Sequence, residues 1–392
     1  MPPLDGLRVL DLSRVLAGPY CTMVLADLGA EVIKVERPGV GDETRGWGPP
    51  YTGGEAAYYL SVNRGKRSCA LDLSTDDGRR LAFELCARAD VVIENFKAGT
   101  AKRMGLDRAR VAERNPRVVY CSITGFGSKR EPVGRPGYDF VAQAESGIMS
   151  ITGEADGEPM KVGVAMVDVL TGLHAAVAIL AAVNRGEGDQ IEVSLLDSGL
   201  AALINVGSNV LITGEEPRRH GNAHPNIVPY QSFRTADGWI AIAAPNDGLY
   251  AKLCEVLGAP ELASDERFAA NARRVENRET LIPLLEELLA AKPAEEWLAA
   301  LEKVGVPSGK IRTVPDALRA AADAGLAATT RVPHPTAGEV ELMNSPIQIE
   351  SGLRPAEAPP LLGEHTREVL RELGMDDQEI DRLGAAGVVE LR

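Results

Sequence analysis

Residues 7–36, LRVLDLSRVLAGPYCTMVLADLGAEVIKVE, contain the pattern that decides the fold. The apolar run from Leu7 to Leu12 predicts a buried strand, and the run from Glu31 to Glu36 predicts another. Between them, residues 13–29 predict a loop followed by a helix that ends at Gly29. A strand, a helix and a second strand in this order predict a βαβ unit with parallel strands.

The same alternation continues along the chain. Further strands are predicted in residues 67–73 (RSCALDL), 90–96 (DVVIENF) and 118–127 (VVYCSITGFG). The sequence therefore predicts an α/β, Rossmann-like large domain with a mostly parallel sheet and helices on its faces. Ligands bind at the carboxyl ends of the strands in such sheets. Those ends carry Ser13 to Gly18, Arg37, Asn95 with Phe96, and Thr124 to Gly127.

The composition changes near Asn184, and residues 189–214 predict a strand and one long helix. We expect a large domain in residues 1–215, completed by a return linker and a C-terminal helix in residues 326–392. Residues 216–325 predict a smaller α+β domain, because they combine a strand pattern with two amphipathic helices.

The bulk composition excludes several classes of protein. The chain has 392 residues, 45% of them hydrophobic, and a net charge of -14, which argues against nucleic acid as a partner. The five cysteines are scattered and form no C-x-x-C pair, so neither disulfides nor a metal site is indicated. The N-terminus has no basic segment followed by an apolar one, which favours a cytoplasmic location.

A dinucleotide-binding enzyme is the first alternative that the βαβ pattern suggests. The first loop, SRVLAGP, lacks the G-x-G-x-x-G motif, so close approach to a pyrophosphate is not indicated. Basic residues instead occur at or near the predicted strand ends, which suits a ligand with several phosphates. They are Arg37, Arg45, Arg64, Lys66, Arg67, Lys97, Lys102 and Arg103.

Asp168 is the only formally charged residue between Lys161 and Arg185, where a glycine-containing loop leads into an alanine-rich helical run. An ionised carboxylate in apolar surroundings is costly unless it is hydrogen-bonded or used in chemistry. Two interpretations remain open: Asp168 is the helix N-cap, or it is a catalytic nucleophile. The run does not predict a membrane span, because Gly163, Asp168 and Gly172 interrupt it.

Seven ordered motifs together resemble the class III coenzyme A transferases over nearly the whole chain. They are residues 4–50, NRGKRSCALDL, ADVVIENFKAGTAKRMG, GRPGYDFVAQAESG, KVGVAMVDVLTG, HPNIVPYQSFRTADG and PPLLGEHTREVL. The resemblance implies that Asp168 is the nucleophile and that coenzyme A and acyl-CoA are substrates, with no tightly bound cofactor and no metal. It also implies an interlocked homodimer, and a coenzyme A pocket formed by Val15, Leu16, Ala17, Arg37, Leu71, Asn95, Phe96, Thr100 and Arg103.

The chemistry that the resemblance implies uses a carboxylate, because a carboxylate is ionised at neutral pH and needs no general base to attack a thioester. The α-methylacyl-CoA racemases are similar in fold and use a histidine in a G-H-D motif. This chain has Gly137, Tyr138 and Asp139 there. A tyrosine with a pKa near 10 is poorly matched to proton abstraction, so we favour the transferase.

Substrate identity is the least determined part of the prediction. Leu16 replaces the glutamine of the oxalate-using members, and HGNAHPNIVPYQ, residues 220–231, replaces their glycine-rich flap. Both differences argue against formate and oxalate as substrates, and the HPNIVPYQ segment resembles that of members that use succinyl-CoA and a dicarboxylic acid. A second carboxylate needs a cation, for which Arg45, Arg218, Arg219 and His220 are candidates. The predicted acyl site also includes Trp47, Tyr138 and Gly221, the last as an oxyanion donor.

Overall fold

The computed structural model describes residues 1–130 and 135–392, which form two compact units. Unit 1 contains residues 1–148, 162–211 and 326–392, and unit 2 contains residues 149–161 and 212–325. The predicted boundaries after residues 215 and 325 lie close to two of these divisions. Residues 149–161 differ from the prediction, which assigns them to the large domain.

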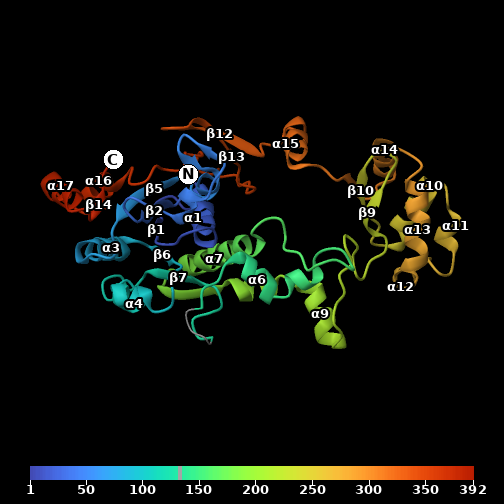
Figure 1. The fold of residues 1–392 in the computed structure, drawn as a ribbon, viewed down its shortest axis with the longest axis horizontal. Helices are drawn as coiled ribbons and strands as arrows, with labels where there is room; N and C mark the ends of the chain where they lie inside the picture. The colour runs from blue at the N-terminus through green and yellow to red at the C-terminus, as the bar shows by residue number, and fades with distance from the viewer. Residues whose placement is uncertain (131–134) are drawn as a thin grey trace. The chain divides into compact units, whose positions relative to one another are not determined.

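The described residues of unit 1 form a seven-stranded sheet in the order β14-β5-β2-β1-β6-β7-β8 (Figure 1). Neighbouring strands are parallel from β5 to β8, and β14 is antiparallel to β5. The strands are β1 (Arg8–Asp11), β2 (Glu31–Glu36), β5 (Lys66–Leu71), β6 (Val91–Glu94), β7 (Val119–Thr124), β8 (Asp189–Ser194) and β14 (Val389–Glu390). The prediction of a mixed α/β fold with a parallel sheet is confirmed. The parallel strands follow the 3-2-1-4-5-6 order of Rossmann sheets, whose ligand crevice opens between β1 and β6.

Each face of this sheet is covered by helices. On β1, Val9 packs into a core shared with α1 (Ala17–Asp27) and α7 (Met166–Arg185). The next residue, Leu10, points into the opposite core, shared with α3 (Asp76–Arg88), α16 (Thr366–Glu372) and α17 (Asp377–Ala385). Successive strand residues point to opposite faces, so a parallel strand covered on both sides is apolar throughout.

Helix α7 packs closely on α1. A Cβ added at Gly172 would lie 2.6 Å from the carbonyl oxygen of Ala17, so only glycine permits this approach. Among the described residues, α7 is long and apolar enough to cross a membrane, and α8 with α9 passes the same test if the two are taken as one span. Val167, Ala175 and Ile179 of α7 are buried in the core, as in the core helix of a globular unit.

Residues 189–214 differ from the predicted strand and single helix. After β8 they form α8 (Leu195–Ala201) and α9 (Ile204–Thr213), which are bent by 76° relative to each other. Ile204 has a φ of 41°, which is rare for a β-branched residue and prevents a continuous helix.

The structure also describes shorter elements between residues 43 and 151. They are η1 (Glu43–Gly46), β3 (Tyr51–Thr52), β4 (Glu55–Ala56), α2 (Ala57–Val62), α4 (Thr100–Met104), α5 (Arg108–Ala112), α6 (Asp139–Glu145) and η2 (Ile148–Ile151).

The C-terminal segment of unit 1 contains more structure than the predicted linker and single helix. Strands β12 (Thr329–His334) and β13 (Gly338–Met343) pair antiparallel, and Val332 and Val340 pack against Tyr59 and Leu60. After α16 and α17 the chain ends in β14, which extends the sheet beyond β5 (Figure 1). The segment therefore completes the large unit through both a core contact and strand pairing.

Unit 2 has its own antiparallel sheet and core. Its sheet order is β11-β10-β9, and Phe233, Ile240 and Leu285 are among the buried residues. The buried Arg274 donates to the carbonyl oxygens of Val228 and Phe268. The elements are β9 (Tyr230–Arg234), β10 (Trp239–Ala243), α10 (Asp247–Leu257), α11 (Glu261–Ser264), α12 (Asn271–Glu276), α13 (Arg278–Leu289), α14 (Ala294–Val304), β11 (Ser308–Lys310) and α15 (Val314–Asp323).

Candidate active site

A cavity of about 170 Å³ opens at the carboxyl ends of β1 and β6, where the order of the sheet reverses. The side chain of Asn95 joins the two loops: its Oδ1 accepts from the Arg14 amide at 3.0 Å, and its Nδ2 donates to the Arg14 carbonyl oxygen at 2.7 Å. The lining includes Val15, Leu16, Ala17, Asn95 to Ala98, Gly125 to Ser128, Gly137, Tyr138 and Asp168. The side chain of Asn95 thus fixes the two loops on either side of the Rossmann crevice.

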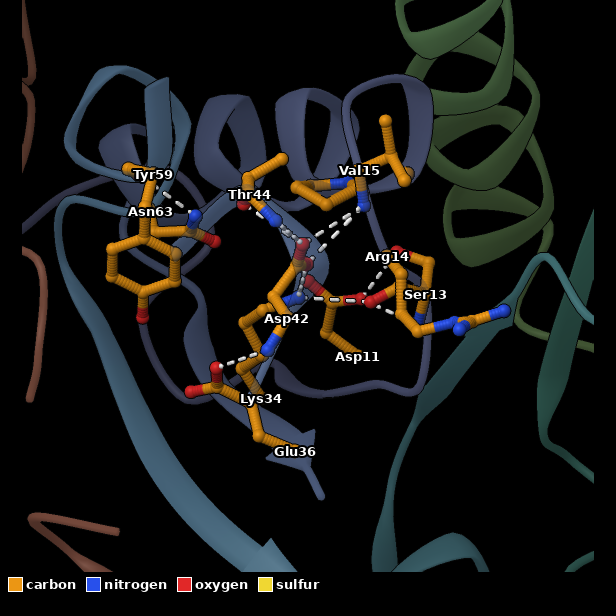
Figure 2. Close-up of polar contacts among 12 residues, drawn as sticks. Asp11, Ser13, Arg14, Val15, Lys34, Glu36, Asp42, Thr44, Tyr59 and Asn63 are labelled. Atoms are coloured by element: carbon orange, nitrogen blue, oxygen red, sulfur yellow. Dashed lines mark hydrogen bonds and ion pairs between the residues drawn. The ribbon is translucent and has the colours of Figure 1, made fainter. Parts of the chain in front are cut away.

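A buried network of charges lies beneath the first loop of this cavity, and Figure 2 shows most of its members. Lys66 Nζ lies 3.2 Å from Asp11 Oδ2, and Lys34 Nζ lies 3.0 Å from Asp42 Oδ2. Burial opposes ionisation of Asp11, but the charges of Lys34 and Lys66 lower its pKa to about 2. Ser13 is tied to this network, because its backbone amide donates to Asp11 and its carbonyl oxygen accepts from Lys34 Nζ.

Val15 has a φ of 72°, a left-handed conformation that a β-branched residue rarely adopts. Its backbone amide donates to Asp42 Oδ2 at 3.2 Å, and Asp42 also accepts from the amide and hydroxyl of Thr44 (Figure 2). The charge network therefore holds a strained loop residue in the wall of the cavity. Strain of this kind persists where the surroundings over-determine the conformation, and it is concentrated at functional sites.

Asp168 lies in the first turn of α7, is 8% exposed, and faces the cavity. Within residues 1–130 and 135–392, no hydrogen-bond donor reaches its carboxylate oxygens. Burial raises the pKa of Asp168 to about 7, and the nearby charge of Asp139 adds to the effect. A strongly raised carboxyl pKa inside a cavity is typical of a functional group rather than a structural one.

The interpretation of Asp168 as an N-cap is wrong. The N-cap position of α7 is Ala165, which offers no side-chain acceptor. Asp139 of α6 takes that role instead, because its Oδ1 accepts from the amides of Val167 at 2.8 Å and Asp168 at 3.2 Å. The side chain of Asp168 is therefore free for chemistry.

An aromatic pair lies beside this carboxylate. The rings of Trp47 and Tyr58 meet edge to face, with centroids 5.2 Å apart. Tyr58 and Ala165, the residue before α7, pack against the same small core, and both burial and the charge of Asp168 raise the pKa of the Tyr58 hydroxyl. Tyr58 carries no sequence signal of its own, because YYL in residues 58–60 is typical of any core helix.

Comparison with known proteins agrees with this geometry. The model of CoA-transferase family III matches residues 4–366. The chain belongs to CoA-transferase family III. It is 43% identical over 396 residues to succinyl-CoA:glutarate CoA-transferase of Mus musculus, covering all of this chain and 91% of that protein. It is 42% identical over 320 residues to acetyl-CoA:oxalate CoA-transferase of Acetobacter aceti, covering 80% and 82%. A crystal structure of a CAIB/BAIF family protein from Brucella suis has a TM-score of 0.83 and 45% identity, covering 95% and 99%.

This family membership confirms the predicted enzyme class, a class III CoA-transferase. Of the residues predicted to bind coenzyme A, those of the first loop together with Asn95 and Phe96 line the cavity. Arg37 and Leu71 lie at the carboxyl ends of β2 and β5, whereas Thr100 and Arg103 lie on α4, where Arg103 donates to the Thr100 hydroxyl at 2.8 Å. Three basic lining residues, Arg14, Lys97 and Arg135, are absent from the predicted pocket.

The structure corrects the predicted cationic set. Four of its members are held in ion pairs: Arg45 with Glu36 and Glu55, Arg64 with Asp27, Lys66 with Asp11, and Arg67 with Glu368 and Glu372. Arg45 is the clearest case, because its guanidinium also donates to the Tyr59 hydroxyl and the Pro360 carbonyl oxygen. Its donors are occupied by the protein, so it does not offer a free cation to a substrate. Sequence alone does not separate basic residues that are held in ion pairs from basic residues that are free to bind a ligand.

His220 and Gly221 belong to unit 2. Burial lowers the pKa of His220, and the charges of Arg278 and Arg218 lower it further, so these cations lie near the ring. Gly221 has a φ of 58°, and a Cβ added there would meet nothing closer than Glu154 Oε2 at 3.7 Å. Arg219 differs from its prediction as a free cation, since it donates to the carbonyl oxygens of Glu154 and Gly157.

No group of three or more metal-ligating side chains exists within the described part of the chain. All five cysteines are free and buried. Burial raises the pKa of the thiols of Cys69, Cys86 and Cys121 to about 12, so these thiols are neutral and inert at physiological pH. Asp168 is therefore the nucleophile candidate that the geometry favours.

Proposed function

We propose that this protein transfers coenzyme A from an acyl-CoA donor, succinyl-CoA, to a dicarboxylic acid through an aspartyl-CoA thioester on Asp168. The observation that carries the proposal is the position of that carboxylate: it faces the cavity of the Rossmann crevice without a hydrogen-bond donor to occupy it. Names of the relatives support the substrate class, because both the glutarate and the oxalate enzyme act on dicarboxylic acids.

The reaction begins when a carboxylate oxygen of Asp168 attacks the thioester carbonyl of the donor. The C–S bond breaks, which gives a mixed anhydride and free coenzyme A thiolate. The thiolate then attacks the aspartyl carbonyl carbon, the anhydride C–O bond breaks, and the donor acid leaves as a carboxylate. The acceptor acid repeats these steps in reverse, so two covalent steps replace one direct exchange.

The raised pKa of Asp168 suits this chemistry. A carboxylate with an ordinary pKa near 4 is a much weaker base than a thiolate, so displacing the thiolate from the thioester is uphill. Burial and the charge of Asp139 raise the pKa of Asp168 to about 7, which brings it closer to the thiol that it displaces. The carboxylate remains substantially ionised at neutral pH, so no general base is needed.

Coenzyme A is proposed to lie across the switch point, with its thiol toward Asp168. Val15 to Ala17, Asn95 and Phe96 supply the walls, and the exposed Arg37 and Arg103 are proposed to bind phosphate. Charge-assisted hydrogen bonds to phosphate favour arginine at such positions. Lys97, which also lines the cavity, is a further candidate.

The acid-binding part of the site is proposed to include Trp47 and Tyr138, which both belong to unit 1. Trp47 and Tyr138 are 41% and 57% exposed, so both rings are available to a substrate or a partner chain. In unit 2, His220 and Gly221 stay predicted substrate residues, and the charges of Arg278 and Arg218 at His220 suit a carboxylate.

We further propose a cytoplasmic, interlocked homodimer. The exposed apolar side chains of Val177 on α7 and of Ile204 and Leu211 on α9 support a partner chain, because large apolar side chains left in water favour association. Light scattering on the purified protein tests this: a mass of one chain at micromolar concentration contradicts the proposal.

The test of the proposed activity is a panel of acyl-CoA donors, including succinyl-CoA, against mono- and dicarboxylic acids, with the CoA esters read by mass spectrometry. We expect transfer to dicarboxylic acids with ping-pong kinetics, and loss of transfer in Asp168→Ala and Asp168→Asn. An Asn variant that keeps more than a few per cent of the rate contradicts the role of Asp168.

A second experiment distinguishes the proposed transferase from the alternative, a racemase. A racemase incorporates deuterium from heavy water into a 2-methylacyl-CoA with no acceptor acid present, whereas the proposed transferase needs an acceptor and exchanges no α-hydrogen. Deuterium uptake without an acceptor would overturn the transferase.

A further inference from the structure

Helix α7 is capped by a residue outside it. Its own N-cap residue, Ala165, has no acceptor side chain, although the first amides of a helix need hydrogen-bond partners. Asp139 Oδ1 accepts from the amides of Val167 at 2.8 Å and Asp168 at 3.2 Å. A side chain nearly thirty positions earlier therefore does what an N-cap residue ordinarily does locally.

Asp139 is itself held in place. It is 8% exposed, and its second oxygen, Oδ2, accepts from Gln143 Nε2 at 2.6 Å. The fully buried Gln143 also accepts, through Oε1, from the amide of Val162 at 2.8 Å. The pair thus fixes both the segment that enters α7 and the first turn that carries Asp168.

The charge of Asp139 acts against an effect that would weaken the nucleophile. A helix N-terminus favours the ionised form of a carboxylate in its first turn, which lowers its pKa. A second carboxylate bound to the same amides opposes that effect. Burial is the larger cause of the raised pKa of Asp168, and the charge of Asp139 is the other.

We propose that Asp139 is a positioning residue for Asp168: it caps α7, fixes the first turn, and places a negative charge beside the attacking carboxylate. The proposal rests on the proposed function for its kinetic consequences, and on the hydrogen bonds alone for its structural ones. It gives the Asp of the Gly137–Asp139 motif a role that needs no histidine at the preceding position. Tyr138 supplies the N-cap backbone of α6, and its side chain lines the cavity.

Two substitutions separate the cap from the charge. Asp139→Asn keeps an oxygen acceptor for the two amides and removes the charge, so we expect the acid limb of the pH profile of kcat to move to lower pH. The KM for acyl-CoA should stay near the wild-type value, because Asp139 does not line the cavity. Asp139→Ala removes both the acceptor and the charge. We expect kcat to fall roughly tenfold or more, because the free energy of a lost helix cap corresponds to a rate factor of about this size.

Asp376 provides a matched control. It is the N-cap of α17, where it accepts from the Glu379 amide at 2.9 Å, and it lies outside the active site. Asp376→Ala should alter neither the pH profile nor kcat. Wild-type kcat and pH profile in both Asp139 variants would overturn the proposal, as would an Asn variant with the same pH profile as the wild type.

Amide hydrogen exchange tests whether Asp139 caps α7, and this measurement does not depend on enzyme activity. In Asp139→Ala the amides of Val167 and Asp168 should exchange faster, and in Asp139→Asn they should stay protected. Unchanged exchange in the Ala variant contradicts the cap. A wild-type protein that transfers no coenzyme A, but shows this exchange pattern, would refute the proposed function while leaving the cap in place.

Discussion

At Asp168, burial and a neighbouring carboxylate produce a pH dependence with a defined sign. The attacking form is the carboxylate, and its pKa is raised from 3.8 to about 7. We therefore expect kcat/KM to fall as pH drops through about 7, by roughly tenfold per pH unit on the acid side. Initial rates at constant ionic strength between pH 5 and 9 measure this. An acid limb near pH 4 would mean that Asp168 is solvated like an ordinary aspartate.

The same raised pKa predicts a stability effect. A group whose pKa is higher in the folded state stabilises the fold below its unfolded pKa, and that stability is lost as pH rises through the folded value. Ionised Asp168 should thus destabilise the free protein at pH 8. We expect Asp168→Asn to raise Tm at pH 8 and to raise it progressively less toward pH 4. A lower Tm in Asp168→Asn at pH 8 would contradict the prediction.

At the residue scale, the sequence identifies Asp168 as a lone charge in an apolar run. It does not decide whether Asp168 is a helix N-cap or a nucleophile. The decision needed Asp139, which lies in a different helix and meets α7 only in the folded chain. Sequence could not identify Tyr58 as a site residue for a similar reason, because its proximity to Asp168 depends on how α2 and α7 are placed around the crevice.

At the scale of elements, the segment after β2 depends on buried charges. Arg45 joins Glu36 and Glu55, whose side chains are 1% and 12% exposed. Arg45→Ala leaves both carboxylates without this partner, so we expect a loss of about 3 to 5 kcal/mol in the free energy of unfolding. Urea unfolding measures the loss. A variant with wild-type stability and a raised KM for the acid would instead support the substrate role predicted from sequence.

Arg37 and Arg103 give the opposite expectation. Both are exposed, and neither takes part in a buried ion pair within the described residues. We expect Arg37→Ala and Arg103→Ala to leave Tm nearly unchanged and to raise the KM for acyl-CoA roughly tenfold, because a phosphate contact contributes about 1.5 to 3 kcal/mol. Unchanged KM values in both variants would place the phosphates elsewhere, with Lys97 the next residue to test.

The strands of the parallel sheet were predictable because each is buried on both faces and reads as an apolar run between turn signals. The break between α8 and α9 was not, since residues 195–213 keep a helical apolar pattern across Ile204. The hairpin β12–β13 was missed for another reason. Its proline and glycine content resembles a linker, and its strands are stabilised by packing on Tyr59 and Leu60 from far earlier in the chain.

At the scale of the whole molecule, the order of the strands places the crevice between β1 and β6, and the residues that meet there come from widely separated segments of the chain. The sequence indicated which segments end strands, but not which strands are neighbours. The strand order of the folded chain supplies that information.

The most direct test of the account is to trap the covalent intermediate on Asp168. The tryptic peptide of residues 162–185 contains Asp168 as its only acidic side chain. Protein incubated with succinyl-CoA and then with hydroxylamine should carry a hydroxamate on this peptide, and Asp168→Asn protein or protein without succinyl-CoA should carry none. Modification of another peptide, or none in the active wild-type enzyme, would contradict the account.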